Sequence, residues 1–219
     1  MFELNSNMYI VKNIIDNSPF YVIDNFYEDP HSIVSFLKSQ PSSLHKWTPD
    51  QHVDSYNNVY FEDRRHVIES DTILHVYKFL STLCGQRYLN QSIITNLIRF
   101  NNKTFNDYKN NYWWPHLDNG YNGLIYLNEH DEECGTNLYK NLDPQNKPCP
   151  TPEHLYPWQP KSNFKLVKSL KPKFNRLVLF DGNHFWHGMN ICNDDYFGQH
   201  YRMNQVLFFH SIVAENALC

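Results

Sequence analysis

The sequence contains little glycine, and its apolar runs are short. Only 7 of the 219 residues are glycine, while 16% are aromatic. This composition argues against the glycine-rich loops that bind phosphates and favours a β-rich core. The longest apolar runs, such as residues 177–180 and 206–209, have the length of a strand and are far too short to span a bilayer. These shortages argue against a phosphate-loop enzyme and against a membrane-spanning protein.

Basic charge and paired cysteines are also scarce. The net charge is -4, so no basic field attracts nucleic acid or an anionic membrane surface. The five cysteines are an odd number, none forms a Cys-x-x-Cys pair, and a chain of this size needs no disulfides. Residues 1–5 have neither the basic start nor the apolar core of a signal peptide. We therefore expect a cytoplasmic protein with reduced thiols.

The length predicts a single domain, in which residues 1–91 form an N-terminal α/β segment. Apolar and aromatic density predicts a strand at 19–24. Capping residues and helical periodicity predict helices at 29–38 and 71–85, the second with Asp71 as its N-cap and Gly85 as its stop. Residues 42–65 are polar and predict no clear element.

From residue 92 onward, short strands alternate with polar turns. The expected strands are residues 93–100, 112–117, 123–127, 136–139, 164–167, 175–180, 185–189 and 201–209. Many short strands of similar length predict a mainly β sandwich or jelly roll with helices packed on one sheet. The proline-rich insert at 141–163 is either a passive surface loop or a lid over a binding site.

His116 and Asp118 are the strongest candidates for a metal site. Residues two apart on a strand project from the same face, so this imidazole and carboxylate would enter one cavity behind the aromatic residues 112–114. A histidine from a later strand would complete a face of two histidines and one carboxylate. Such a face leaves coordination positions open on a non-haem Fe(II) ion.

Two other histidines have an acidic residue at the same offset. His52 and Asp54 lie in polar, unpatterned sequence, and His130 and Glu132 lie in a charged turn that we expect to be solvated. Only the pair at 116 and 118 is followed by a histidine on a strand and then by an arginine on a strand.

The third ligand is either His187 or His184. Residues 181–183 have the sequence of a turn, which places Phe185 and His187 on one face of the next strand. We therefore prefer His187. The alternative for either residue is a core histidine that is bonded to the backbone.

Arg202 is the candidate for binding a carboxylate of a co-substrate. On the strand at 201–209 it shares a face with Asn204 and Val206. An arginine that points into a barrel is costly unless a carboxylate meets it, and its planar fork suits that carboxylate. The alternative is an arginine that faces outward from the strand.

Together these residues resemble the Fe(II)/2-oxoglutarate-dependent oxygenases, and among them the small prolyl-hydroxylase-like and phage-type members. The resemblance covers the chain from about residue 92 to its end. The motifs that carry it lie at 116–118, 123–128, 135–139, 175–182, 187–188 and 202. The resemblance implies a double-stranded β-helix, or jelly-roll, core.

The same resemblance implies roles for the site residues. His116, Asp118 and His187 would ligate Fe(II), and Arg202 would bind the distal carboxylate of 2-oxoglutarate. Tyr126 matches a tyrosine that binds this carboxylate in relatives, with a core aromatic as the equal alternative. Many relatives have Ser or Thr two residues after the arginine, where this chain has Asn204, whose amide can also donate a hydrogen bond.

The implied reaction is hydroxylation of a C–H bond, coupled to decarboxylation of 2-oxoglutarate, with dioxygen as co-substrate and ascorbate as an accessory. We expect a small-molecule or peptide substrate and no nucleic-acid or membrane partner. The cations at 57–65 either bind an acidic substrate group or belong to a solvated turn. The rival functions are a non-catalytic jelly-roll binding module and a cupin-like metalloprotein that does not use 2-oxoglutarate. The sequence leaves the oligomeric state open.

Overall fold

A computed structural model describes residues 1–44, 61–85, 93–100, 108–130, 133–143, 145 and 158–209. Its strands are β1 (Tyr9–Ile15), β2 (Ser18–Asp24), β3 (Ser43–Leu44), β4 (Phe61–Ile68), β5 (Ile93–Phe100), β6 (Asn111–Trp113), β7 (Tyr121–Tyr126), β8 (Thr136–Asn141), β9 (Trp158–Pro160), β10 (Phe164–Leu170), β11 (Arg176–Asp181), β12 (Trp186–Met189) and β13 (Arg202–Phe209). Its helices are α1 (Pro30–Ser39) and α3 (Leu74–Cys84), with short 3-10 helices at Ser70–Ile73 and Lys161–Asn163. Among the described residues, neither α-helix has the length and apolar character to cross a membrane.

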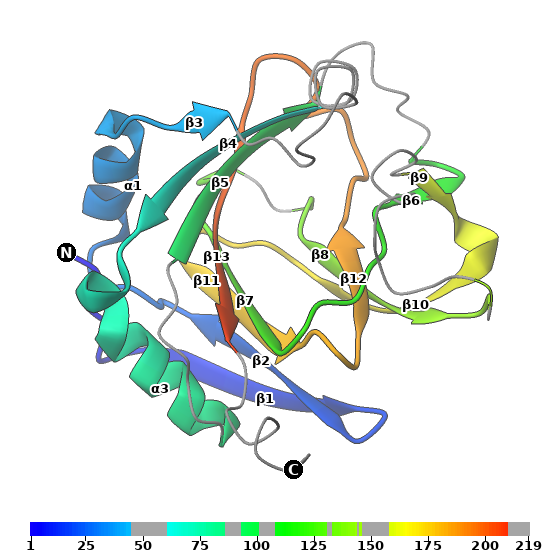
Figure 1. The fold of residues 1–219 in the computed structure, drawn as a ribbon, viewed down its shortest axis with the longest axis horizontal. Coiled ribbons are helices and arrows are strands. Elements are labelled where there is room, and N and C mark those ends of the chain that lie inside the picture. Colours follow the sequence, from blue (N-terminus) through cyan, green and yellow to red (C-terminus); the bar gives the residue numbers. More distant parts are fainter. Residues whose placement is uncertain are drawn as a thin grey trace, which may run out of the picture.

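The strands form two facing layers (Figure 1). The large sheet has the order β1-β2-β11-β7-β13-β5-β4-β3, and the small sheet has the order β10-β8-β12. β6 and β9 form a further two-stranded sheet. This sheet is linked to the small sheet by an isolated β-bridge between His116, in the chain after β6, and His187 of β12. From β5 to β13 the chain passes repeatedly between the two layers through antiparallel pairs. This alternation is that of a jelly roll, so the predicted fold class is confirmed.

The N-terminal segment extends the large sheet on both sides. β2 pairs with β11, and β4 pairs with β5 along its whole length. α1 and α3 cover the face of the large sheet that is turned away from the small sheet (Figure 1). The core beneath the helices includes Ile33, Leu37, Val76, Leu80, Ile93 and Leu177. The other face of the large sheet is therefore free to form the interior of the barrel.

Several local predictions are confirmed. β5 has the predicted bounds. Asp29 caps α1 by accepting a hydrogen bond from the backbone N–H of Ser32 at 3.0 Å. Gly85 ends α3 in the left-handed region, with φ of 65°, because glycine adopts this conformation without a steric penalty.

Other local predictions are wrong or incomplete. Asp71 is not an N-cap, because it lies inside a 3-10 turn that begins at Ser70 and precedes α3. The strand predicted at 112–117 ends at Trp113, since Trp114 has φ of 50° and Pro115 has no N–H to give to a ladder. β1, β3, β4 and β9 were not predicted, and β9 lies within the insert that was expected to be a loop, where it pairs with β6. Residues 146–157 of the proline-rich insert lie outside the described residues.

Candidate metal centre

The chain that follows β6 and the strand β12 are tied together by their backbones. The backbone N–H of His116 donates to the carbonyl of His187 at 3.0 Å, and the N–H of His187 donates back at 2.8 Å. Two residues on, the N–H of Asp118 donates to the carbonyl of Gly182 at 3.1 Å. His116 and Asp118 therefore project from an extended segment that is fixed at two points, although only His116 belongs to a β-bridge.

The side chains of these residues converge on one point. One ligand atom from each of His116, Asp118 and His187 lies within 4.8 Å of the other two. Oδ2 of Asp118 is 3.1 Å from Nε2 of His187 and 3.5 Å from Nε2 of His116. In the described part of the chain, no other group of three such side chains meets the same condition.

Hydrogen bonds on the far side of each ring fix the imidazoles. Nδ1 of His116 lies 2.7 Å from the carbonyl oxygen of Trp114, and Nδ1 of His187 lies 3.0 Å from that of Phe185. A carbonyl oxygen can only accept, so in the neutral rings Nδ1 carries the proton and Nε2 keeps its lone pair. Both lone pairs are then available to one cation, as in metal sites whose histidines are oriented by carbonyls.

The charges of these groups suit a divalent cation. Burial raises the pKa of the Asp118 carboxyl, but its close contacts with the two histidines outweigh this effect, so the net shift is downward and the group is a carboxylate. Burial lowers the pKa of His187, followed by the charge of His116, which keeps this imidazole neutral. Two imidazoles and one carboxylate on one side of a point fit a non-haem Fe(II) ion and leave further positions open.

The three side chains lie on the wall of a cavity of about 400 Å³ between the two layers. Its apolar wall includes Ile94, Ile98, Trp113, Leu124, Met189 and Val206. A largely apolar cavity with a few convergent polar groups is typical of small-molecule sites.

Arg202 opens β13 and faces this cavity, with only 3% of its surface exposed. Its nitrogens donate to the carbonyls of Cys134 (3.2 Å) and Gly135 (3.5 Å) and to Oδ1 of Asn204 (2.7 Å). All these partners are neutral oxygens, and none of the described residues gives Arg202 a carboxylate. A buried guanidinium with this set of partners carries a charge that an anion in the cavity could neutralise. Asn204 and Val206 line the cavity as well.

Tyr126 lies beside Arg202, with the guanidinium carbon 5.5 Å from the centre of its ring. Its hydroxyl donates to Oγ1 of Thr136 at 2.8 Å. Thr136 lines the cavity, whereas Tyr126 is not among the described residues that do. The tyrosine thus contacts two groups of the cavity wall from behind.

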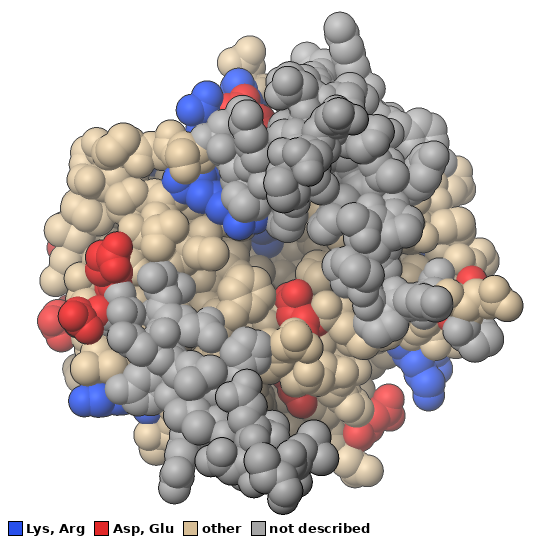
Figure 2. Space-filling view, in the orientation of Figure 1, with Lys and Arg blue, Asp and Glu red and all other residues tan. Residues whose placement is uncertain are grey.

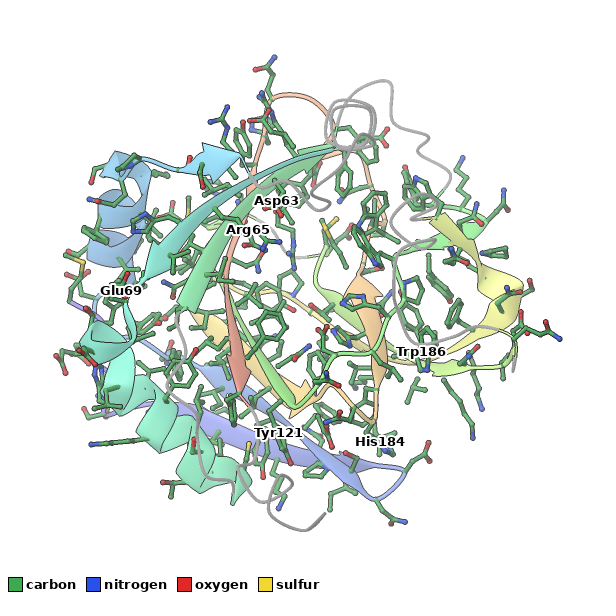
Figure 3. The ribbon with its side chains drawn as sticks, in the orientation of Figure 1. Asp63, Arg65, Glu69, Tyr121, His184 and Trp186 are labelled. Carbon is green, nitrogen blue, oxygen red and sulfur yellow. The ribbon has the colours of Figure 1, made fainter. Side chains whose placement is uncertain are left out.

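The other candidate histidines lie elsewhere. His184 is exposed in the turn before β12, near the outer edge of the barrel (Figure 3), and it is absent from the described cavity wall. His130 is exposed. His52, Asp54 and Glu132 lie outside the described residues.

Three polar residues of the cavity wall were not predicted as site residues: Asn96, Asn122 and Thr136. Arg65, one of the cations at 57–65 for which contact with an acidic substrate group was an open alternative, also lines the cavity. Arg65 projects from β4 toward the interior (Figure 3) and is held by the fully buried Asp63, with Nε and Nη2 each 3.0 Å from Oδ2. Period-two alternation would have placed Asn122 on the face of Leu124 and Tyr126, but the predicted strand began one residue too late to include it.

No protein-family model matches the chain, and no curated protein does. Several solved structures are similar to it, including these three. A 2OG-Fe(II) oxygenase family oxidoreductase from Burkholderia pseudomallei has 13% identity and a TM-score of 0.42, with 84% of this chain and 80% of that chain covered. HygX from Streptomyces hygroscopicus, solved with nickel, 2-oxoglutarate and hygromycin B, has 12% identity and a TM-score of 0.46, with 89% and 83% covered. A Pseudomonas putida prolyl-4-hydroxylase has 12% identity and a TM-score of 0.36, with 83% and 98% covered.

These similar structures include a member of the family that the sequence resembles. Identities of 12–13% and TM-scores below 0.5 carry no information on the role of any residue. The roles of His116, Asp118, His187 and Arg202 therefore depend on the geometry of this chain alone.

Proposed function

We propose that the protein is an Fe(II)- and 2-oxoglutarate-dependent dioxygenase that hydroxylates a C–H bond of its substrate. One observation carries the proposal. His116, Asp118 and His187 direct their ligand atoms to one point on the wall of a cavity that Arg202 also lines. The wall of one cavity thus carries three side chains that could bind a cation and a guanidinium that could bind an anion.

Each residue has a defined task in this proposal. His116, Asp118 and His187 hold Fe(II), and the guanidinium of Arg202 binds the distal carboxylate of 2-oxoglutarate. Oδ1 of Asn204 is taken by Arg202, so its amide nitrogen is the part that donates to the same carboxylate. Tyr126 supports this subsite through Thr136 and through its ring beside Arg202.

When bound, iron and 2-oxoglutarate supply the chemistry that reduces dioxygen, releases succinate and carbon dioxide, and oxidises the substrate. The protein orients these groups and excludes water with its apolar wall. The free thiols of Cys84, Cys134 and Cys192 fit a reducing compartment such as the cytoplasm.

For the substrate, we propose a small molecule or one side chain of a peptide, bearing an acidic group that contacts Arg65. A volume of about 400 Å³ is near the lower end for small-molecule sites. Asp63 binds one edge of the Arg65 guanidinium and thereby orients it. Lys and Arg atoms gather over β4 and β5 beside the central hollow of the molecule (Figure 2), which favours the approach of an anion.

The test is the formation of succinate from 2-oxoglutarate by the full chain with Fe(II) in air, with and without ascorbate. Amino acids and peptides are screened as pairs of a carboxylate and its neutral amide, with nucleosides as a further set. We expect slow succinate release without substrate and faster release with the acidic member of a pair. Binding of Fe(II) without any succinate would instead support a cupin-like metalloprotein, and binding of neither Fe(II) nor 2-oxoglutarate would support a binding module.

A further inference from the structure

Asn122 places its carboxamide directly against the ligand atoms of the candidate metal centre. It lies on β7, opposite Phe180 on β11 and Phe208 on β13, and is 2% exposed. Its Nδ2 is 2.6 Å from Oδ2 of Asp118 and 2.9 Å from Nε2 of His187. These are two of the three atoms that face the position of the cation.

Each of the two protons on Nδ2 of Asn122 has one acceptor. The carboxylate oxygen of Asp118 accepts one of them. Nε2 of His187 accepts the other, because Nδ1 of that ring gives its proton to the carbonyl of Phe185. With the carboxamide reversed, Oδ1 would meet two further acceptors at these short distances. The ligand atoms therefore dictate the orientation of the amide.

The other end of the carboxamide shows that this orientation has a cost. Oδ1 of Asn122 is buried and has no hydrogen-bond partner among the described residues. It lies beside Gly182, where a Cβ would come within 3.1 Å of it. A buried, unpaired carbonyl oxygen is unfavourable. Both N–H groups of Asn122 nevertheless face the candidate metal ligands Asp118 and His187, and the carbonyl oxygen is the atom left unpaired.

We propose that Asn122 is a positioning residue of the metal centre. Without a cation, its amide nitrogen bridges Asp118 and His187 and holds both in place for binding. When a cation takes the lone pair of His187, the remaining hydrogen bond fixes the Asp118 carboxylate. The proposal rests on the proposed function only in requiring a divalent cation at His116, Asp118 and His187.

The test is titration of the full-length protein with Co(II), followed by calorimetry and by the visible absorption of the bound ion. Asn122→Leu removes both N–H groups at similar size, and we expect it to weaken Co(II) binding by roughly 10- to 100-fold, the usual range for groups that orient metal ligands, with an altered absorption spectrum. Asn96→Leu is the matched control, because Asn96 lines the same cavity without contacting the three ligands. We expect it to bind Co(II) within about twofold of the unmodified protein, inside the usual scatter between distant sites.

Asn122→Asp gives a second and opposite signature. It sets a second carboxylate against Asp118, and like charges this close destabilise one another. The metal-free variant should therefore unfold at a lower temperature than the unmodified protein, and Co(II) should raise its Tm by more. This variant reports how close position 122 lies to the Asp118 carboxylate, whereas Asn122→Leu tests the role of the two N–H groups.

The outcomes separate the two proposals. Unchanged Co(II) affinity and spectrum in Asn122→Leu would overturn the role of Asn122, whatever the activity. Absence of Co(II) binding in the unmodified protein would overturn both proposals. Tight Co(II) binding that Asn122→Leu weakens, in a protein that makes no succinate, would support Asn122 and reject only the oxygenase.

Discussion

His116 and His187 are joined by a reciprocal pair of backbone hydrogen bonds of 3.0 and 2.8 Å, which brings their rings to 4.4 Å between centroids. One residue comes from the segment after β6 and the other from β12, 71 positions later in the chain. The positions of the two imidazoles are therefore constrained by main-chain geometry. Because the two rings are preorganised, the binding of a cation does not have to offset the free-energy cost of bringing them together.

The choice between His187 and His184 can be tested directly. His187→Ala should weaken Co(II) or Fe(II) binding by more than roughly 100-fold, since it removes a ligand rather than a group behind one. His184→Ala removes an exposed imidazole three residues away and should leave the affinity unchanged. Calorimetric titration of both variants measures this difference. Equal losses would contradict the assignment of the third ligand.

Arg202 should matter for 2-oxoglutarate and not for the metal. Arg202→Ala removes charge-assisted hydrogen bonds to the co-substrate, and we expect its affinity for 2-oxoglutarate to fall by roughly 100-fold, about 3 kcal/mol. Metal affinity should stay within about twofold, because Arg202 contacts none of the three metal ligands. Arg64→Ala, which removes the same charge from a partly exposed position, is the control. Binding is measured with Ni(II)-loaded protein by calorimetry.

The sequence predicts the jelly roll and the convergence of His116, Asp118 and His187 well, because short alternating strands and the spacing of the first two residues are local patterns. Short alternating strands reveal the layers, and the spacing of His116 and Asp118 is visible without knowledge of tertiary contacts. The structural reason why the two residues share a face is nevertheless different from the continuous strand that was predicted. The two residues share a face because backbone bonds to His187 and Gly182 hold them, although Trp114 and Pro115 interrupt the strand.

The sequence does not predict parts of the structure that depend on distant partners. β4 carries charged residues on both faces, and its strand conformation comes from pairing with β5, some 30 residues later. The sequence therefore left Arg65 open between a solvated turn and a contact with an acidic substrate group, whereas in the structure Asp63 and Arg65 point to the interior (Figure 3). The sequence likewise does not indicate that the hydroxyl of Tyr126 donates to Thr136 and does not face the cavity.

Asp24 should make the stability of the fold depend on acid pH. Arg176 donates to its carboxylate at 2.6 and 3.0 Å, and Lys173 donates at 3.1 Å, which links β2 to β11 and the turn before it. The hydrogen bond from Arg176 lowers the Asp24 pKa below its ordinary value of 3.8, against the effect of burial. A carboxyl with a depressed pKa in the folded state stabilises it above the unfolded pKa and loses this contribution as pH falls through the folded pKa.

Asp24→Asn should therefore lower the Tm at about pH 7, and the difference from the unmodified protein should shrink toward about pH 2. Thermal unfolding followed by circular dichroism across this range measures the effect. A difference in Tm that stays constant with pH would show that the carboxylate charge is not the source of the stabilisation.

Gly188 should be essential to the metal centre for a steric reason. A Cβ at this position would lie 2.3 Å from the carbonyl oxygen of Trp113 and 3.0 Å from that of Trp114, and both are backbone atoms that cannot rotate away. Gly188→Ala should force the segment after β6 away from β12, which breaks the bridge between His116 and His187. We expect a loss of about 1–3 kcal/mol in the free energy of unfolding and a marked loss of Co(II) affinity. Gly123→Ala is the matched control, because its Cβ would meet only the side chains of Leu207 and Leu179 at 3.4 to 3.7 Å. Unfolding in urea and Co(II) titration of both variants measure the two effects, and normal metal binding by Gly188→Ala would contradict the proposed dependence of the site on this close approach.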